Sequence, residues 1–122
     1  MTFQRIGDSI ETKPIIMGAQ VYIPTDRGIR VIPMNNIVRI EARSNYSKLF
    51  FDNERPLIVA KVLHWFEDKL EDQFFYRIHR THIVNRQFIA TVSIDNNLLT
   101  LANGEQLKIS RRRKEHILKR LA

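Results

Sequence analysis

A succession of short β-branched segments separated by turn residues is the feature that most constrains how this chain folds. Such segments are QVYIPTD and GIRVIPM near the start, and FFYRIH, IATVSID, LLTLA and QLKIS towards the end. Apolar runs of this length, bounded by Asn, Asp and Gly, are typical of strands. Hairpin turns are predicted at residues 26–28, 96–97 and 103–104, where Asn-Gly in the last is a strong signal. The sequence therefore predicts a mainly β fold.

Two more strands flank a polar loop in the first half of the chain. Ile37, Val38 and Ile40 begin one strand, and Tyr46 and Leu49 belong to the next. The loop between them is Arg43-Ser44-Asn45, and residues 52–55 (Asp-Asn-Glu-Arg) predict another turn after the second strand.

One interior helix and one C-terminal helix interrupt this pattern. Residues 59–70 predict an amphipathic helix, because their apolar positions follow the i, i+3, i+4, i+7 spacing. These positions are Val59, Val62, Leu63, Phe66 and Leu70. Residues 111–121 predict a short helix with Ser110 as its N-cap. Its inward-facing residues are expected to be Ile117, Leu118 and Leu121.

Length and composition limit the class of protein. The chain has 122 residues and no cysteine, so we expect one domain, no disulfide framework and a reducing cytoplasm. No apolar stretch is long enough for a membrane helix, and the N-terminus lacks the apolar core of a signal peptide. Residues 1–18 carry little pattern and are expected to form an arm, leaving residues 19–122 as the domain.

The charge distribution favours a polyanionic partner. The chain has 20 Lys and Arg against 13 Asp and Glu, a net charge of +7, and its pI is about 10.1. Basic residues gather between Lys108 and Arg120, whereas acidic residues gather at residues 67–72. We therefore expect one positive side and one neutral or acidic side.

The run Arg111-Arg112-Arg113-Lys114 opens the predicted C-terminal helix. Cations in a first helical turn oppose the helix dipole, while the free N–H groups there bind phosphate readily. The run indicates an anion site, and a merely solvated basic surface is the alternative.

The segment FYRIHRTHIVN combines Arg77, His79, Arg80 and His82 with apolar residues. A metal site is not expected, because a spacing of three places two histidines of one strand on opposite faces, and no carboxylate lies within the segment. No nucleophile with a base, phosphate loop or carboxylate pair indicates catalysis. His79 is either a structural histidine or a ligand contact, and Arg80, followed by a turn, is the better contact candidate.

The polar loop around Asn45 is a third candidate segment. Asn can bond adenine edges through two atoms, and Ser47 and Lys48 suit phosphate. Asn and Ser are also ordinary turn residues, so this loop alone establishes nothing.

The series IVRIEARSNYSKLFF, an amphipathic helix, FFYRIHRTHIVN, an Asn-Gly turn and LKISRRRKEHIL resembles the LytTR family of bacterial DNA-binding domains. The resemblance runs from about Ala19 to the C-terminus. It implies an elongated, multi-sheet β fold whose loops enter successive major grooves and bend the DNA. By matching position it implies base contacts from Asn45, Arg80 and Arg112.

Charge and position add expected phosphate contacts, which are Lys48, Arg77, Arg111 and Lys114. Most family members join this domain to a phosphorylatable receiver or a membrane segment. Only about 18 residues precede the matching region here, so a freestanding regulator and a fragment of a longer one both remain open.

The sequence thus predicts a double-stranded DNA partner, with two copies on repeated half-sites, in the control of transcription. No enzyme activity, cofactor, metal, membrane partner or small-molecule substrate is expected. One alternative is an RNA-binding domain that uses sheet aromatics as stacking platforms. Its aromatics, however, follow the pattern of core residues, and no RNP-like run of glycine and aromatic residues is present. These aromatics are Phe50, Phe51, Phe74, Phe75 and Tyr76. Another is an interaction module that sequesters a second regulator through residues 67–72.

Overall fold

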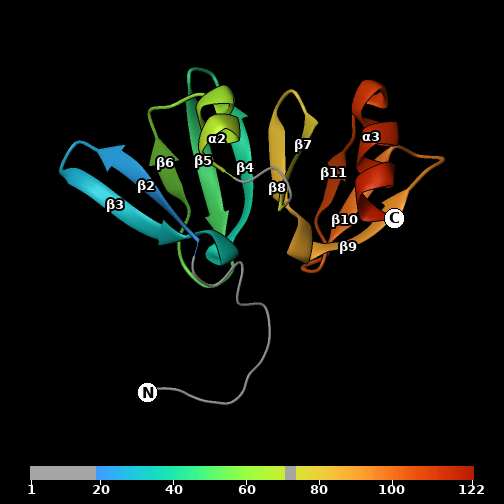
Figure 1. Cartoon of the computed structure of the whole chain (residues 1–122), viewed down its shortest axis with the longest axis horizontal. Coiled ribbons are helices and arrows are strands. Elements are labelled where there is room, and N and C mark those ends of the chain that lie inside the picture. Colours follow the sequence, from blue (N-terminus) through green and yellow to red (C-terminus); the bar gives the residue numbers. More distant parts are fainter. Residues whose placement is uncertain (1–18, 71–73) are drawn as a thin grey trace, which may run out of the picture.

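The structure is a computed structural model that describes residues 19–70 and 74–122. The predicted arm, residues 1–18, lies outside the described residues. Three antiparallel sheets follow one another along the long axis of the molecule (Figure 1). The predicted mainly β, multi-sheet fold is therefore confirmed.

The N-terminal sheet is a two-stranded ribbon of β2 (Gln20–Thr25) and β3 (Gly28–Pro33). The central sheet has the strand order β6-β5-β4-β8-β7. Its strands are β4 (Ile37–Arg43), β5 (Tyr46–Phe51), β6 (Leu57–Val59), β7 (Phe75–His79) and β8 (His82–Asn85). The C-terminal sheet has the order β11-β10-β9. It contains β9 (Ile89–Ser93), β10 (Leu98–Leu101) and β11 (Gln106–Lys108).

Two short 3-10 turns, η1 (Met34–Asn36) and η2 (Arg86–Phe88), each precede a strand. The buried side-chain amide of Asn85 connects η2 to the residue that follows η1. Its Nδ2 donates to the Ile37 carbonyl at 2.9 Å, and its Oδ1 accepts from the Gln87 amide at 3.0 Å. Among the described residues no helix is long and apolar enough to cross a membrane.

The central sheet separates two hydrophobic cores, because successive residues of a strand point to opposite faces. Ile83 of β8 belongs to the core shared with the ribbon and helix α2 (Leu63–Lys69), whereas its neighbour Val84 belongs to the core under helix α3 (Arg111–Leu121). Ile37 and Ile40 share one core despite a spacing of three, because the register of β4 shifts between Ile37 and Arg39.

The interior helix begins later than predicted. Val59 lies at the end of β6, where it pairs with Ser47, and α2 starts only at Leu63. The apolar spacing suits either a helix from Val59 or a strand that ends there, since Val59 and Leu63 are buried in the same core in the observed fold. The predicted C-terminal helix is confirmed, with Ser110 as the N-cap residue and Ile117 buried.

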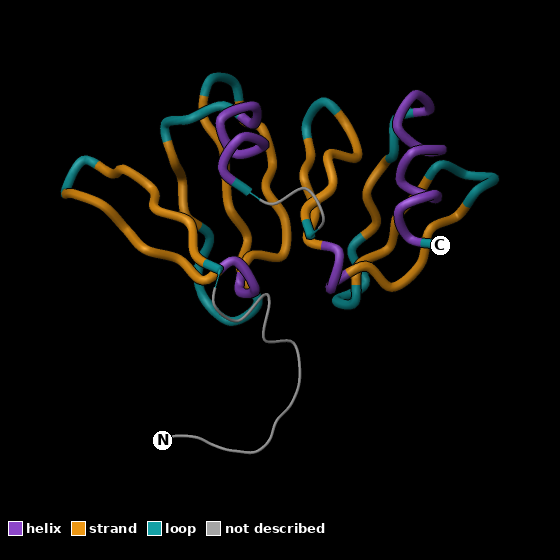
Figure 2. The backbone as a smooth tube through the Cα atoms, in the orientation of Figure 1, coloured by secondary structure: helices purple, strands orange, loops and turns teal. Residues whose placement is uncertain are grey.

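The β4–β5 turn and the β7–β8 turn lie side by side at the same end of the strands of the central sheet. β4 and β8 are antiparallel neighbours, so the end of β4 lies beside the start of β8, and the Ala42 amide donates to the Thr81 carbonyl at 2.9 Å. Figures 1 and 2 show that the start of α3 lies along this same edge, with its C-terminal end turned away. We call residues 44–45, 80–81 and 110–112 together the loop edge.

Candidate nucleic-acid interface

The first part of the loop edge is the two-residue connection Ser44-Asn45, flanked by the pair Arg43 and Tyr46. Ser44 has a φ of 58°, the positive sign that two-residue hairpin turns favour. The connection leaves Asn45 exposed. Lys48 is half-buried on β5, with its Nζ 5.2 Å from the centre of the Phe50 ring.

The second part is the Arg80-Thr81 turn between β7 and β8. The Arg80 side chain is exposed and makes no hydrogen bond or ion pair within the described parts of the chain. Its cation is therefore held at the surface without a neutralising acid.

Arg77 stands behind this turn and has partners on two elements. Its Nε donates to the His79 carbonyl at 2.8 Å, and its Nη2 donates to the Arg80 carbonyl at 2.7 Å. Its Nη1 donates to Oε1 of Glu67 on α2. The Arg77 phosphate contact stays a prediction, and these bonds give the guanidinium a first role inside the protein.

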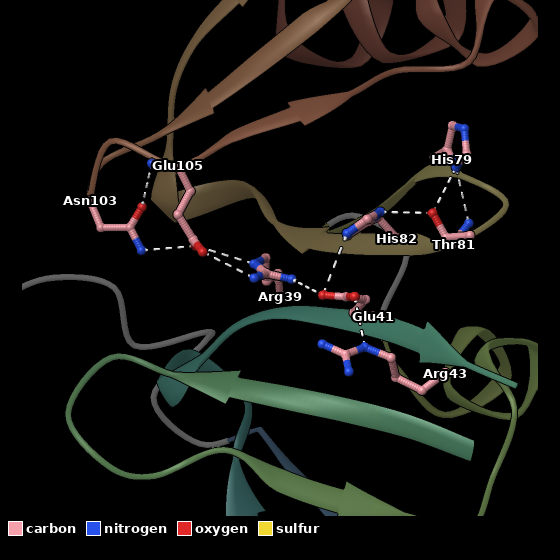
Figure 3. A network of polar contacts seen from close by, with 8 residues as sticks. All are labelled: Arg39, Glu41, Arg43, His79, Thr81, His82, Asn103 and Glu105. Atoms are coloured by element: carbon pink, nitrogen blue, oxygen red, sulfur yellow. Dashed lines mark hydrogen bonds and ion pairs between the residues drawn. The ribbon is translucent and has the colours of Figure 1, made fainter.

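Thr81 lies between the two histidines of the segment (Figure 3). Its Oγ1 is 2.8 Å from His79 Nδ1 and 2.9 Å from His82 Nδ1. The Thr81 amide also donates to His79 Nδ1 at 3.2 Å, so this nitrogen is an acceptor. It follows that the hydroxyl donates to His79 and accepts from His82.

His79 and His82 do not lie on one strand, so the argument from opposite faces of a single strand does not apply to them. They end β7 and begin β8, where they pair across the turn with ring centroids 6.4 Å apart. Burial, reinforced by the positive charges of Arg80 and Lys108, lowers the pKa of His79 below 6.5. Burial, followed by the charge of Arg39, lowers that of His82 as well. Both environments favour neutral rings.

The third part of the loop edge is the start of α3, where Arg111 and Arg112 are exposed. Ser110 is the N-cap residue, but its side chain makes no cap hydrogen bond, and its buried Oγ has no partner among the described residues. The helix instead closes through the Ser110 carbonyl, which accepts from the Arg113 amide at 3.0 Å. The Lys114 ammonium donates to the Ile94 carbonyl at 2.7 Å, which holds that side chain against the C-terminal sheet.

Arg113, by contrast, is half-buried, and its Nη1 donates to the Arg77 carbonyl at 3.5 Å. Burial and the nearby charges of Arg77 and Arg112 lower the Arg113 pKa. Of the four cations at the start of α3, the first two are thus the ones presented outward.

A buried arginine joins the central and C-terminal sheets below the loop edge (Figure 3). Arg39 donates to both carboxylate oxygens of Glu105, from Nε at 3.1 Å and from Nη2 at 3.0 Å. Its Nη1 donates to Glu41 at 2.9 Å, and its guanidinium lies 3.7 Å over the Phe50 ring. The Arg39 side chain is only 8% exposed. This group was not predicted from the sequence.

The Arg39 group extends towards the Thr81 turn. Burial alone would raise the Glu41 pKa, but hydrogen bonds from Arg39 and Arg43 lower it overall. His82 Nε2 lies 3.9 Å from a Glu41 oxygen. A hydrogen bond from Arg39 also lowers the Glu105 pKa against the effect of burial. The two carboxylates therefore stay ionised around the arginine.

The predicted separation into a positive and an acidic side is only partly met. Glu67, from the acidic segment, contacts Arg77 of the basic segment. Asp68 is exposed, with one oxygen 3.7 Å from His64 Nε2. The remaining acids of that segment, at residues 71–72, lie outside the described residues.

Comparisons with known proteins agree with this arrangement. A search of curated proteins gave no match. One solved structure with the same fold is the LytTr DNA-binding domain of a Bacillus cereus protein described as a methyl-accepting/DNA response regulator. The similarity has a TM-score of 0.70 at 26% sequence identity, and covers 84% of this chain and 96% of that domain. The sequence model of the LytTr DNA-binding domain matches residues 27–122. The chain therefore belongs to the LytTR family of DNA-binding domains.

Proposed function

We propose that this chain binds double-stranded DNA in a sequence-specific manner through the loop edge and thereby regulates transcription. The observation that carries the proposal is that Asn45, Arg80 and Arg112 are exposed and belong to the three neighbouring segments of the loop edge. Each comes from a different segment, so one molecule presents three separated contacts to a duplex.

The three side chains suit base edges in the major groove. Arg80 and Arg112 donate through planar guanidinium groups, which match the O6 and N7 acceptors of guanine. Asn45 both donates and accepts, which matches adenine. A correct pair of this kind discriminates by about 1–3 kcal/mol.

Flanking cations supply contacts to the DNA backbone. Lys48, Arg111 and Lys114 are the proposed phosphate contacts, and Arg77 can join them through N–H groups not used in its internal bonds. Backbone amides at the start of α3 add donors, because the first amides of a helix have no intrahelical acceptor. This set fixes the register of the protein on the duplex, and the three base contacts read the sequence.

A domain of this size offers limited contact area, so we propose that two copies bind repeated half-sites on the DNA. We also propose that the protein acts in the cytoplasm. The RNA alternative has less support. Phe51, Phe75 and Tyr76 are buried, and Phe50 is covered by Arg39, so these aromatics form no open stacking platform.

Selection from a pool of random duplexes at two salt concentrations tests the proposal. We expect an enriched, repeated motif whose spacing gives the distance between half-sites. Salt-sensitive binding without any enriched motif would reduce the function to sequence-independent attraction and contradict the proposal. Competition between single-stranded RNA and duplex DNA for the protein tests the RNA alternative, which requires the RNA to displace the duplex.

A further inference from the structure

Glu67 and Arg77 together hold the backbone of the turn that carries Arg80. One guanidinium donates to the carbonyls of His79 and Arg80, at 2.8 Å and 2.7 Å. The Glu67 carboxylate fixes the same guanidinium from α2. Because the carbonyls before and after the Arg80 amide are both bound, the direction in which Arg80 leaves the turn is constrained.

The same strand also sets the distance from this turn to α3. The Ser110 amide donates to the Ile78 carbonyl at 2.9 Å, and Arg113 donates to the Arg77 carbonyl at 3.5 Å. A change in the position of Arg77 is therefore transmitted to both base-contact segments at this end of the loop edge.

We infer that Glu67 and Arg77 form a positioning pair that orients Arg80 for base recognition, so that an acidic residue increases the specificity of a DNA-binding surface. This inference rests on the proposed function. Neither member of the pair needs to touch a base, because both act through the Arg80 turn.

Electrostatics alone predicts the opposite sign for Glu67. A carboxylate near a polyanion weakens binding, so its removal strengthens binding to any duplex. A positioning role predicts that the same removal weakens binding to the recognised duplex relative to others. The two effects are separated by the affinity ratio between recognised and shuffled sequences.

The test compares Glu67→Ala with Asp68→Ala in the full chain. Both changes remove one carboxylate from α2, both acids lie 3.7 Å from the same His64 ring, and Ala favours helix. The probes are the duplex enriched from the random pool by the wild-type chain and a shuffled duplex of the same composition.

We expect Glu67→Ala to lower the affinity ratio about tenfold, within the roughly 5- to 150-fold that one bidentate base contact provides. Asp68→Ala should change it by less than about twofold, because its charge is exposed. Glu67→Gln removes the same charge but keeps an acceptor for Arg77, so it should recover most of the ratio. Equal ratios for Glu67→Ala and Asp68→Ala would overturn the inference.

Arg77→Lys provides a second arm that preserves net charge. A lysine ammonium cannot span two carbonyls and a carboxylate as a guanidinium does, so the ratio should fall while affinity for the shuffled duplex is kept. An unchanged ratio would mean that only the charge of residue 77 matters, which contradicts the positioning role. Circular dichroism and thermal melting confirm that each variant is folded.

Arg80→Ala distinguishes a failure of the proposed function from a failure of the positioning role of Glu67 and Arg77. If it lowers the ratio and Glu67→Ala does not, the proposed function stands and the positioning role is overturned. If the wild-type chain binds both duplexes equally, the proposed function fails, and the positioning role falls with it.

Discussion

Two arginine-containing regions, the Arg39 group and the start of α3, differ in whether carboxylates neutralise the arginine charge. The Arg39 side chain is 8% exposed and is bound by two carboxylates, Glu41 of its own strand β4 and Glu105 of the connection between β10 and β11. Arg111 and Arg112 are exposed, and within the described ranges their side chains have no acidic partner. The residue type is the same, but in the Arg39 group ion pairs neutralise its charge, whereas at the start of α3 its charge is exposed to solvent.

The location of the acids accounts for this difference. Glu41 lies two residues from Arg39 on β4, and Glu105 lies in the connection between β10 and β11 and reaches Arg39 from the C-terminal sheet. The only acid of α3 is Glu115, which makes no hydrogen bond or ion pair among the described residues. An arginine therefore stabilises the fold where carboxylates converge on it, and remains available to a polyanion where they do not.

The largest effect is expected from Arg39→Ala. Removal of the guanidinium leaves Glu105 without its cation and Glu41 with only Arg43, and uncovers the Phe50 ring. We expect the free energy of unfolding to fall by about 2–4 kcal/mol, somewhat below the value for fully buried pairs because Glu105 is 40% exposed. Urea denaturation measures it.

Arg43→Ala is the matched control for this substitution. Arg43 also donates to Glu41, at 2.8 Å, but its side chain is 42% exposed. Its loss should cost less than about 1 kcal/mol. Similar losses for both arginines would mean that burial does not distinguish the two, and the contrast between the regions would fail.

The next effect concerns Arg112→Ala and should appear in binding rather than stability. We expect specific binding to weaken by about 1–3 kcal/mol, with a smaller loss on random duplex. Arg111→Ala, a proposed phosphate contact, should weaken both by a similar factor. Fluorescence anisotropy on the two duplexes measures this, and an equal loss on both for Arg112→Ala would leave it only a phosphate contact.

A smaller effect is expected from pH. The pKa values of His79 and His82 are lowered on folding, so the unfolded chain binds more protons as the pH falls through 6.5. The free energy of unfolding should therefore decrease from about pH 7.5 to about pH 5.5. Protonation of His79 also removes the acceptor used by the Thr81 amide and hydroxyl.

Urea denaturation at several pH values checks this dependence. His79→Gln should reduce the slope of the free energy of unfolding against pH. A slope insensitive to His79→Gln would assign the pH dependence to other groups.

The smallest effect is expected on α3 itself. Arg111 places a positive charge in the first turn of this helix, where it opposes the helix dipole. Arg111→Ala should therefore raise the free energy of unfolding by about 0.3–1 kcal/mol while it weakens DNA binding. A loss of stability in thermal melting would show that Arg111 also supports the fold.

Local patterns in the sequence predicted most of this architecture. The polar residues Ser44 and Asn45 between apolar runs, and the basic run after Ser110, marked two parts of the loop edge that the structure contains. Arg80, followed by a predicted turn, was a contact candidate from the sequence alone, and the resemblance to a known family added its role as a base contact. The two hairpin turns are brought together by the antiparallel pairing of β4 with β8, and the start of α3 is held beside them by the hydrogen bond from Ser110 to Ile78. No local sequence pattern contains either contact.

The contacts that bind the sheets together could not be predicted in this way. Arg39 and Glu105 are 66 positions apart, so no periodicity relates them. The spacing of Val59 from Leu63 suits a helix as well as a strand end, so the sequence predicts a helix from Val59 where the structure has the end of β6. Arg77 was assigned by its charge to DNA phosphate, and only the folded turn shows the carbonyls and carboxylate that it meets first.

The separation between the loop edge and the two hydrophobic cores has an evolutionary consequence. Asn45, Arg80 and Arg112 are exposed and belong to neither core. If the proposed base contacts hold, substitutions at these positions should alter recognition without creating cavities or unpaired buried groups. Under the proposed function, operator preference could therefore diverge by single substitutions among descendants of this chain while the fold is kept.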